Sequence, residues 1–251
     1  MESLDRVAGD VDEVTRFFTQ AAQGYERALT AELPLGATAR QIEDGLDRWF
    51  GSEDRREDDC VVVYVAGHGD SGVKFKDHVL FTRDSSPRLA SSVIRTADLM
   101  RWLFGGEGAR PQSILLILDV CYAGQGAGEA LAELVKGGAQ VLRGGAGFWV
   151  VATSDPNSEA GDGTFVSAFL AIMKDEAWAP RGGAEFISPA DLSVAVNQRF
   201  RDQPSAQQAL LYTVAAGRIA PPFIRNPGFT RDLDGLSIAD QAHWDPKARG
   251  V

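Results

Sequence analysis

Three continuous apolar runs rich in β-branched residues stand out along the chain. They cover residues 60–66 (CVVVYVA), 114–118 (ILLIL) and 148–153 (FWVVAT). Because hydrophobicity runs through each of them without alternating, each is expected to form a strand that is buried on both faces, as in a parallel sheet. The pattern therefore predicts the central strands of an α/β domain.

Helical patterns lie between and around these strands. Ser188 followed by Pro189 predicts an N-cap with a proline in the first turn, and Thr96 and Asp98 are plausible caps for another helix. Helices are predicted over residues 10–18, 99–104, 165–173 and 190–200. Strands that alternate with helices indicate an open, mostly parallel sheet with helices on both of its faces.

Several segments depart from this alternation. Residues 77–82 are expected to form a short hairpin and residues 209–215 a late strand, so the sheet is expected to be mixed at an edge. The glycine-rich stretch 124–147 is expected to be an exposed connection with only a short helix near 129–135. We therefore predict one folded domain over residues 1–223 and a C-terminal linker over residues 224–251, where turn signals replace periodicity.

Composition and charge limit the function classes. The 251 residues are 44% hydrophobic and 24% charged, as in an ordinary globular domain, and the net charge of −10 without a basic stripe argues against a nucleic-acid partner. No apolar run approaches the ~20 residues of a membrane span, and the polar N-terminus does not resemble a signal peptide. Two cysteines are too few for a disulfide framework, so we expect a cytoplasmic protein.

His68 and Cys121 are the strongest candidates for chemistry. Each directly follows a predicted strand, and in open α/β sheets functional groups gather beyond the carboxyl ends of the strands. A nearby imidazole can accept the proton of a thiol and leave a strong nucleophile. The placement predicts Cys121 as nucleophile and His68 as general base, with the Gly69 and Cys121 amides as oxyanion donors.

Structural roles are the alternative for every one of these residues. A lone cysteine is more often a core residue, and a histidine in a glycine-rich turn can cap backbone groups; Cys60, His78 and His243 keep that interpretation. No metal-ligand spacing is present, so we expect no cofactor, and the sequence does not address activation by calcium. An inactive signalling or assembly module and a different α/β cysteine enzyme, such as an amidase or a thiol acyltransferase, stay open.

The two motifs together resemble a known family. A strand followed by His68-Gly69, paired with a strand that leads into Asp119-x-Cys121-x-x-Gly124, is similar to the caspase, metacaspase and paracaspase group of cysteine peptidases. The resemblance covers about residues 10–223. It implies a caspase-like fold and places the general base at His68 and the nucleophile at Cys121.

Departures from the family pattern bear on the substrate. Aspartate-directed caspases have Gln-Ala-Cys-Arg-Gly at the nucleophile, whereas here Asp119 stands two residues before Cys121, as in metacaspases. A carboxylate in the pocket would attract Arg or Lys at the residue before the scissile bond, P1. Alternatively, Asp119 only holds a loop amide. Asp155 follows the third strand and is a further candidate for substrate binding.

The resemblance carries further expectations about processing and context. The segment 124–147 lies where caspases carry the linker between their two subunits, which makes Lys136 and Arg143 candidate self-cleavage positions. The strand that usually opens the family's fold is not evident. The end of the chain resembles the connector of bacterial multidomain proteins, so a sensor or nucleotide-binding module in the same or a partner protein, and a role in defence or cell death, are expected.

Overall fold

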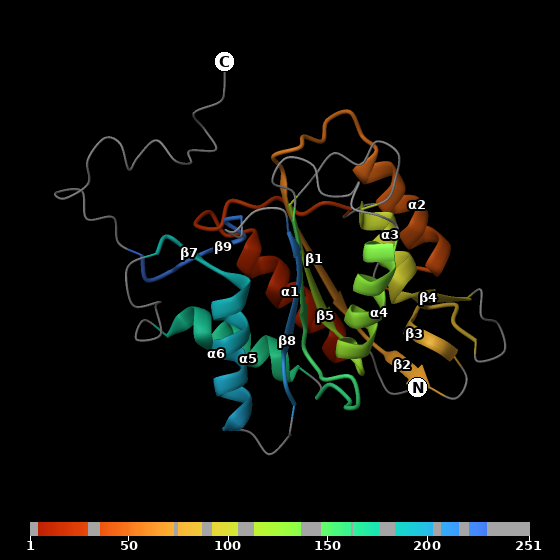
Figure 1. The fold of residues 1–251 in the computed structure, drawn as a ribbon. Coiled ribbons are helices and arrows are strands. Elements are labelled where there is room, and N and C mark those ends of the chain that lie inside the picture. The colour runs from red at the N-terminus through yellow and green to blue at the C-terminus, as the bar shows by residue number, and fades with distance from the viewer. Residues whose placement is uncertain are drawn as a thin grey trace.

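The protein forms a four-stranded sheet at its centre (Figure 1). The structure is a computed structural model that describes residues 5–29, 36–72, 75–86, 92–104, 113–136, 147–161, 163–175, 184–202, 207–215 and 221–229. The strands lie in the order β1 (Cys60–Ala66), β5 (Ser113–Asp119), β6 (Gly147–Ala152) and β8 (Leu210–Ala215). The first three are parallel and β8 is antiparallel to β6, which confirms a mostly parallel sheet that is mixed at one edge.

Helices cover both faces of this sheet, as expected (Figure 1). One face carries α1 (Asp5–Phe18), α5 (Thr164–Lys174) and α6 (Pro189–Arg201), and the other carries α2 (Ala39–Phe50), α3 (Thr96–Phe104) and α4 (Ala123–Lys136). The start of α6 is the predicted one, because the Ser188 side chain accepts a hydrogen bond from the Asp191 amide at 3.1 Å. Among the described residues, no helix is long and apolar enough to cross a membrane.

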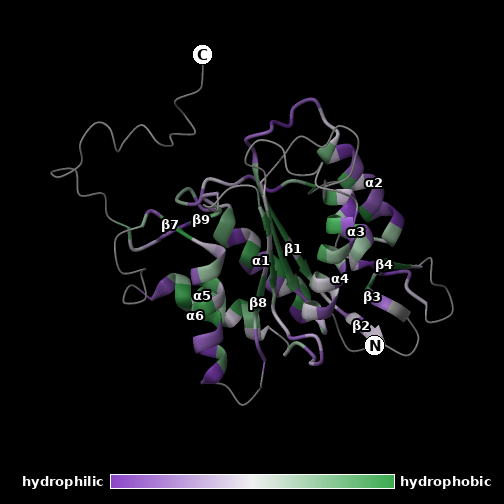
Figure 2. Cartoon of the chain, in the orientation of Figure 1, coloured by the Kyte–Doolittle hydropathy of each residue, from purple (hydrophilic) through white to green (hydrophobic). Residues whose placement is uncertain are grey.

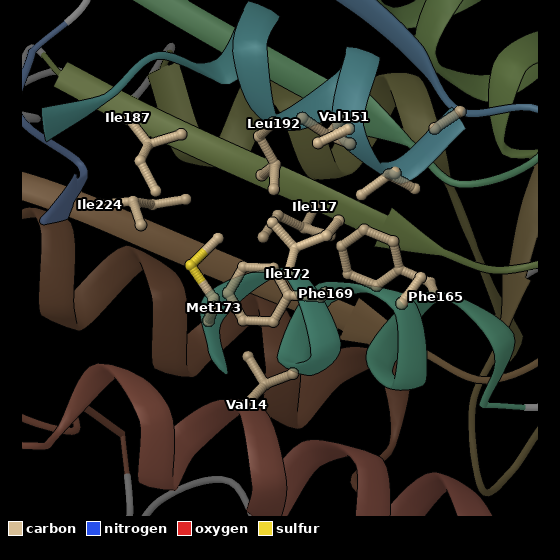
Figure 3. Packing of buried hydrophobic residues seen from close by; sticks show 14 of the residues in the cluster. Val14, Ile117, Val151, Phe165, Phe169, Ile172, Met173, Ile187, Leu192 and Ile224 are labelled. Carbon is tan, nitrogen blue, oxygen red and sulfur yellow. The ribbon is translucent and has the colours of Figure 1, made fainter. Parts of the chain in front are cut away.

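Two hydrophobic clusters lie on opposite faces of the sheet, and every central strand contributes to both. In β5, Leu115 and Ile117 pack towards α1 and α5, while the alternate residues pack towards α3 and α4. Figure 2 shows the central strands β1 and β5 as strongly hydrophobic, and Figure 3 shows Phe169 of α5 between Val14 and Ile117, with Phe165 beside it. Burial on both faces explains why these strands are continuous apolar runs in the sequence.

A second, antiparallel sheet extends the side of the molecule that carries α3 and α4 (Figure 1). It consists of β2 (Gly69–Gly72), β3 (Phe75–Phe81) and β4 (Val93–Arg95), so the expected hairpin is part of three strands. A third sheet pairs β7 (Phe186–Ile187) with β9 (Ile224–Arg225). Asn226 follows β9 and bonds to the carbonyls of Glu185 at 2.8 Å and Ala184 at 3.0 Å, so folded structure continues past the expected boundary at residue 223.

The first part of the glycine-rich stretch 124–147 is helical over residues 124–136, which corrects the prediction of an exposed connection for that part. Helix α4 begins at Ala123 and runs to Lys136, and residues 137–146 are outside the described part. Its first glycines permit close packing: a Cβ at Gly124 would lie 2.9 Å from Cδ of Pro156. The glycine content alone suggested a flexible segment. In the folded protein, these glycines instead let neighbouring residues pack close to the helix, because they have no side chain. No strand of the described part pairs with the outer edge of β1.

Candidate active site

The register between β1 and β5 brings His68 and Cys121 to the same edge of the sheet. Ala66 is the register partner of Asp119, and the Gly67 amide donates to the Asp119 carbonyl at 3.4 Å. His68 and Cys121 each follow their strand by two residues, and both are half-buried. Adjacent strands are about 4.8 Å apart, and the observed topology places the two residues at the same edge of the sheet, as expected.

Unusual backbone conformations flank both residues. Gly67, directly before His68, has φ of 145°, and Tyr122, directly after Cys121, has φ of 58°. A left-handed conformation at a bulky residue costs roughly 1 kcal/mol or more and persists only where the surroundings impose it. Here the Tyr122 amide donates to the Ser158 carbonyl at 3.0 Å, so the loop after β6 helps to hold the turn that carries the thiol.

Gly69 lies against the backbone of Cys121. A Cβ at position 69 would be 2.6 Å from the Cys121 carbonyl oxygen, so no side chain fits there. Gly69 pairs with Leu80, and the Phe81 amide donates to the His68 carbonyl at 3.0 Å. In this antiparallel pattern Gly69 is in a non-hydrogen-bonded pair, so its N–H is left out of the β2–β3 ladder. The geometry is compatible with the oxyanion role predicted for Gly69.

Ser154, which the sequence analysis did not single out, stabilises the turn that carries Cys121. Its hydroxyl is fully buried, accepts a hydrogen bond from the Ala123 amide at 2.9 Å and donates to the Val120 carbonyl at 3.0 Å. The two backbone partners stand on either side of Cys121. The only signal in the sequence was the position of Ser154 beyond the third buried strand, on the same edge as His68 and Cys121.

The carboxylate of Asp119 joins three strands at their carboxyl ends. Its Oδ2 accepts a hydrogen bond of 2.8 Å from the Tyr64 hydroxyl, and its Oδ1 accepts one of 2.8 Å from Thr153 Oγ1. Burial, and then the neighbouring charge of Asp119, raise the pKa of Tyr64 far above its ordinary value, so the phenol stays protonated and donates. Asp119 therefore has a fixed orientation two residues before Cys121.

Asp155 holds its own loop. Its Oδ1 accepts from the Asn157 amide at 2.7 Å, and its Oδ2 accepts from the Ser158 hydroxyl at 2.6 Å. The Ser158 carbonyl in turn accepts a hydrogen bond from the Tyr122 amide, so this aspartate orders the loop beside the turn that carries Cys121. Asp155 thus forms an Asx-type turn beside the candidate site.

His78 is the most unexpected member of the site. Its imidazole is completely buried, with Nε2 2.9 Å from the Cys121 carbonyl oxygen and Nδ1 2.6 Å from Thr96 Oγ1. The sequence analysis gave His78 only a structural role, and nothing in its local sequence indicates a contact with Cys121. Cys60 is at the opposite end of β1, where burial, then Asp59 and Asp58, raise the pKa of its thiol to about 11.

Two further expectations concern cleavage sites and metals. Lys136 is the last residue of α4, where its ammonium pairs with Glu133 at 2.9 Å, and Arg143 lies outside the described residues.

In the part of the chain that the structure describes, no three His, Cys, Asp or Glu side chains gather in a way that could hold a metal ion.

Comparison with known proteins gives one family. The sequence matches a family model described as "Caspase domain" over residues 1–219. Among solved structures, the chain is similar to the crystal structure of a structural-genomics target protein from Geobacter sulfurreducens, with 15% identity and a TM-score of 0.47. That match covers 77% of this chain and 79% of the other. No curated protein matches the chain.

Proposed function

This chain belongs to the caspase-domain family of peptidases, and we propose that it is a cysteine endopeptidase with Cys121 as nucleophile and His68 as general base. The observation that carries the proposal is the register of β1 and β5, which makes Ala66 and Asp119 partners. Both candidate residues follow this pair by two positions. A thiol at the end of one strand can be activated by an imidazole at the end of the adjacent strand, because the imidazole accepts the proton of the thiol.

The reaction follows from these groups. The His68 imidazole accepts the Cys121 proton, and the thiolate attacks the carbonyl carbon of the scissile peptide bond. The oxyanion that forms is stabilised by the Gly69 and Cys121 amides, and His68 then protonates the leaving amine. Water activated by the same imidazole hydrolyses the acyl-enzyme. No third catalytic side chain is required, since the Phe81 amide and the Gly67–Asp119 bond hold the backbone on either side of His68.

Specificity for Arg or Lys at P1 is the second part of the proposal. Asp119 supports it, because Tyr64 and Thr153 donate to its two oxygens from either side and orient the carboxylate. A carboxylate can accept several hydrogen bonds, and the charge-assisted ones from a guanidinium fork or an ammonium are among the strongest that it accepts. Asp155 is proposed to add negative charge at the same sheet edge, and the net charge of −10 favours the approach of basic substrates.

Fluorogenic peptides with Arg, Lys, Asp or Ala at P1 test the proposal, under reducing conditions with and without calcium. We expect cleavage after Arg and Lys, none by Cys121→Ala, and a loss of about 10²-fold or more in His68→Ala. Cleavage only after Asp would contradict the role of Asp119. Cleavage of no peptide would favour an assembly module, and failure of a basic chloromethyl ketone to label Cys121 would favour an amidase or acyltransferase.

Self-cleavage after Lys136 or Arg143 is proposed as the processing step. Peptidases of this kind bind substrates as extended chains, so cleavage after Lys136 requires the last turn of α4 to unwind. The ion pair of Lys136 with Glu133 is exposed and opposes this only weakly. The native chain should yield fragments that Cys121→Ala does not, and identical migration of the two as intact bands would refute self-processing.

The proposed biological setting is a cytoplasmic effector in bacterial defence or cell death, switched on by a sensor or nucleotide-binding module. Support comes from the family and from the resemblance of the C-terminal segment to connectors in bacterial multidomain proteins. Expression of the native chain fused to a forced-dimerisation module should arrest bacterial growth, while the same fusion with Cys121→Ala should not. Equal growth of the two would count against an effector role.

A further inference from the structure

The buried imidazole of His78 is hydrogen-bonded to the backbone of the nucleophile itself. A carbonyl oxygen only accepts hydrogen bonds, so the 2.9 Å contact with Cys121 requires the proton of the ring to be on Nε2. Nδ1 is then an acceptor, and the Thr96 hydroxyl 2.6 Å away is its donor. The pair of contacts fixes both the tautomer and the orientation of the ring.

The backbone of His78 is anchored as firmly as its ring. Its amide donates to Oε2 of Glu129 at 2.7 Å, and Gln125 Nε2 donates to the other carboxylate oxygen at 2.7 Å. Gln125 and Glu129 are in the first turns of α4, the helix that starts two residues after Cys121. Strand β3 is thereby tied to α4 at the point where His78 meets the nucleophile turn.

Two glycines leave the space that this ring occupies. A Cβ at Gly69 would lie 2.9 Å from Nε2 of His78, and a Cβ at Gly126 would lie 2.5 Å from Nδ1. Real Cβ atoms do not approach other atoms this closely, so any larger residue would displace the ring. The ring is therefore built into the site by residues on β2, β3, α3 and α4 together.

We propose that His78 is a positioning residue that fixes the carbonyl of Cys121 and so aims the thiol at His68. The proposal rests on the role of Cys121 proposed above. The peptide unit that carries this carbonyl joins Cys121 to Tyr122, whose left-handed backbone needs an external restraint. Without the Nε2–H donor, the carbonyl loses a partner inside the protein, and the turn relaxes away from the geometry needed for attack.

The test compares two variants in a Cys60→Ala background, in which Cys121 is the only thiol. His78→Leu keeps much of the volume and removes both ring nitrogens, whereas His78→Gln restores an N–H donor at about the same reach from the backbone. Asn197→Leu is the matched control: its amide makes two hydrogen bonds of 2.8 Å that join α6 to the backbone of Ala209, directly before β8, away from Cys121.

We expect His78→Leu to lower kcat about tenfold or more with KM changed less than about twofold, and His78→Gln to recover to within about threefold of native. Asn197→Leu should keep the native kcat despite a lower melting temperature. The rate at which iodoacetamide alkylates Cys121 should fall and recover in the same order. Native kcat and alkylation in folded His78→Leu, or a His78→Gln as slow as His78→Leu, would overturn the proposal.

A second variant and the alkylation rate distinguish a failure of the role proposed for His78 from misfolding of a variant and from a failure of the proposed peptidase function. If His78→Leu does not fold, Thr96→Val decides, because loss of the donor to Nδ1 lets the other tautomer form and should lower kcat about threefold. Unchanged kcat and alkylation in Thr96→Val would then overturn the role of His78. If the native chain cleaves no peptide, the proposed peptidase function fails, while the alkylation rates still decide whether His78 positions the Cys121 thiol.

Discussion

The hydroxyl of Tyr64 donates a hydrogen bond of 2.8 Å to Oδ2 of Asp119, across the parallel strands β1 and β5. Tyr64 is the register partner of Ile117, two residues before Asp119, so both side chains point to the face covered by α1 and α5. Thr153 completes the arrangement from the end of β6. The acidic group proposed to bind the P1 side chain is thus held by the sheet itself.

Removing this hydroxyl should change selectivity as well as stability. In Tyr64→Phe the carboxylate of Asp119 loses one donor, so we expect a stability loss of about 1 kcal/mol and a loss of roughly threefold to tenfold in the preference for Arg over Ala at P1. The ratio of kcat/KM for the two peptides, with thermal unfolding, measures both effects.

Tyr25→Phe is the matched control for this substitution. Its half-buried hydroxyl also makes one hydrogen bond, of 2.9 Å to the Phe223 carbonyl, but away from Asp119. The control should lose similar stability and keep the native preference at P1. A Tyr64→Phe variant with an unchanged Arg-to-Ala ratio would show that Asp119 only links strands.

Gly126 and Gly128 of α4 should respond to alanine with opposite signs. Alanine is better than glycine inside a helix by up to about 1 kcal/mol, so Gly128→Ala should stabilise the protein, since the nearest foreign atom, Tyr212 Cε1, is at 3.9 Å. At Gly126 the new Cβ would lie 2.5 Å from the His78 ring, and we expect a loss of about 1–3 kcal/mol. Denaturant unfolding measures both, and stabilisation by Gly126→Ala would contradict the packing described.

Ser154→Ala should weaken the turn that carries Cys121. The substitution leaves the Ala123 amide without its acceptor and the Val120 carbonyl without its donor, at a cost of about 1–3 kcal/mol, and should lower kcat. Ser193→Ala is the comparison, because this serine is also buried and its hydroxyl makes a long hydrogen bond, of 3.5 Å to the Ala209 carbonyl. Calorimetry and peptide cleavage should separate the two, and equal effects would contradict a specific role for Ser154.

The fold was largely predictable because its signals are local. Strands buried on both faces appear as continuous apolar runs, and the segments 60–66, 114–118 and 148–153 are within a residue or two of β1, β5 and β6. The start of α4 was missed because Gly124 and Gly126 suggested a loop. Whether a glycine provides flexibility or space for packing depends on Pro156 and His78, which only the folded structure brings near.

The residues of the candidate site likewise differ in whether the sequence alone could indicate them. His68 and Cys121 could be proposed from sequence because strand ends are recognisable and lie on one sheet edge, and Asp119 could be proposed because its place before Cys121 resembles metacaspases. His78 and Ser154 could not, since they contact main-chain atoms of the turn that carries Cys121 across 43 and 31 residues of sequence. A backbone carbonyl or amide has no sequence signature, so residues that position it are visible only in three dimensions.

The pH dependence of stability should contain a contribution from His78. Burial lowers the pKa of this imidazole below its ordinary value of 6.5, although the bond to the Cys121 carbonyl and the charges of Glu129 on α4 and Asp70 on β2 act in the opposite direction. As the pH falls below 6.5, His78 is therefore protonated in the unfolded chain before it is protonated in the folded chain. Stability contributed by the neutral ring is complete above pH 6.5 and is lost as the pH falls through the lower folded-state pKa.

The His78→Gln variant lacks this ionisable group, so its comparison with the native chain isolates the contribution of His78 to the pH dependence of stability. Its free energy of unfolding should fall less steeply than that of the native chain between about pH 7 and about pH 5, because all other ionisable groups are shared. Urea unfolding at several pH values in this range measures the difference between the two curves. Parallel curves would mean that the imidazole takes up its proton equally in the folded and unfolded chains, which a ring enclosed by Thr96, Gly126 and the Cys121 carbonyl should not do.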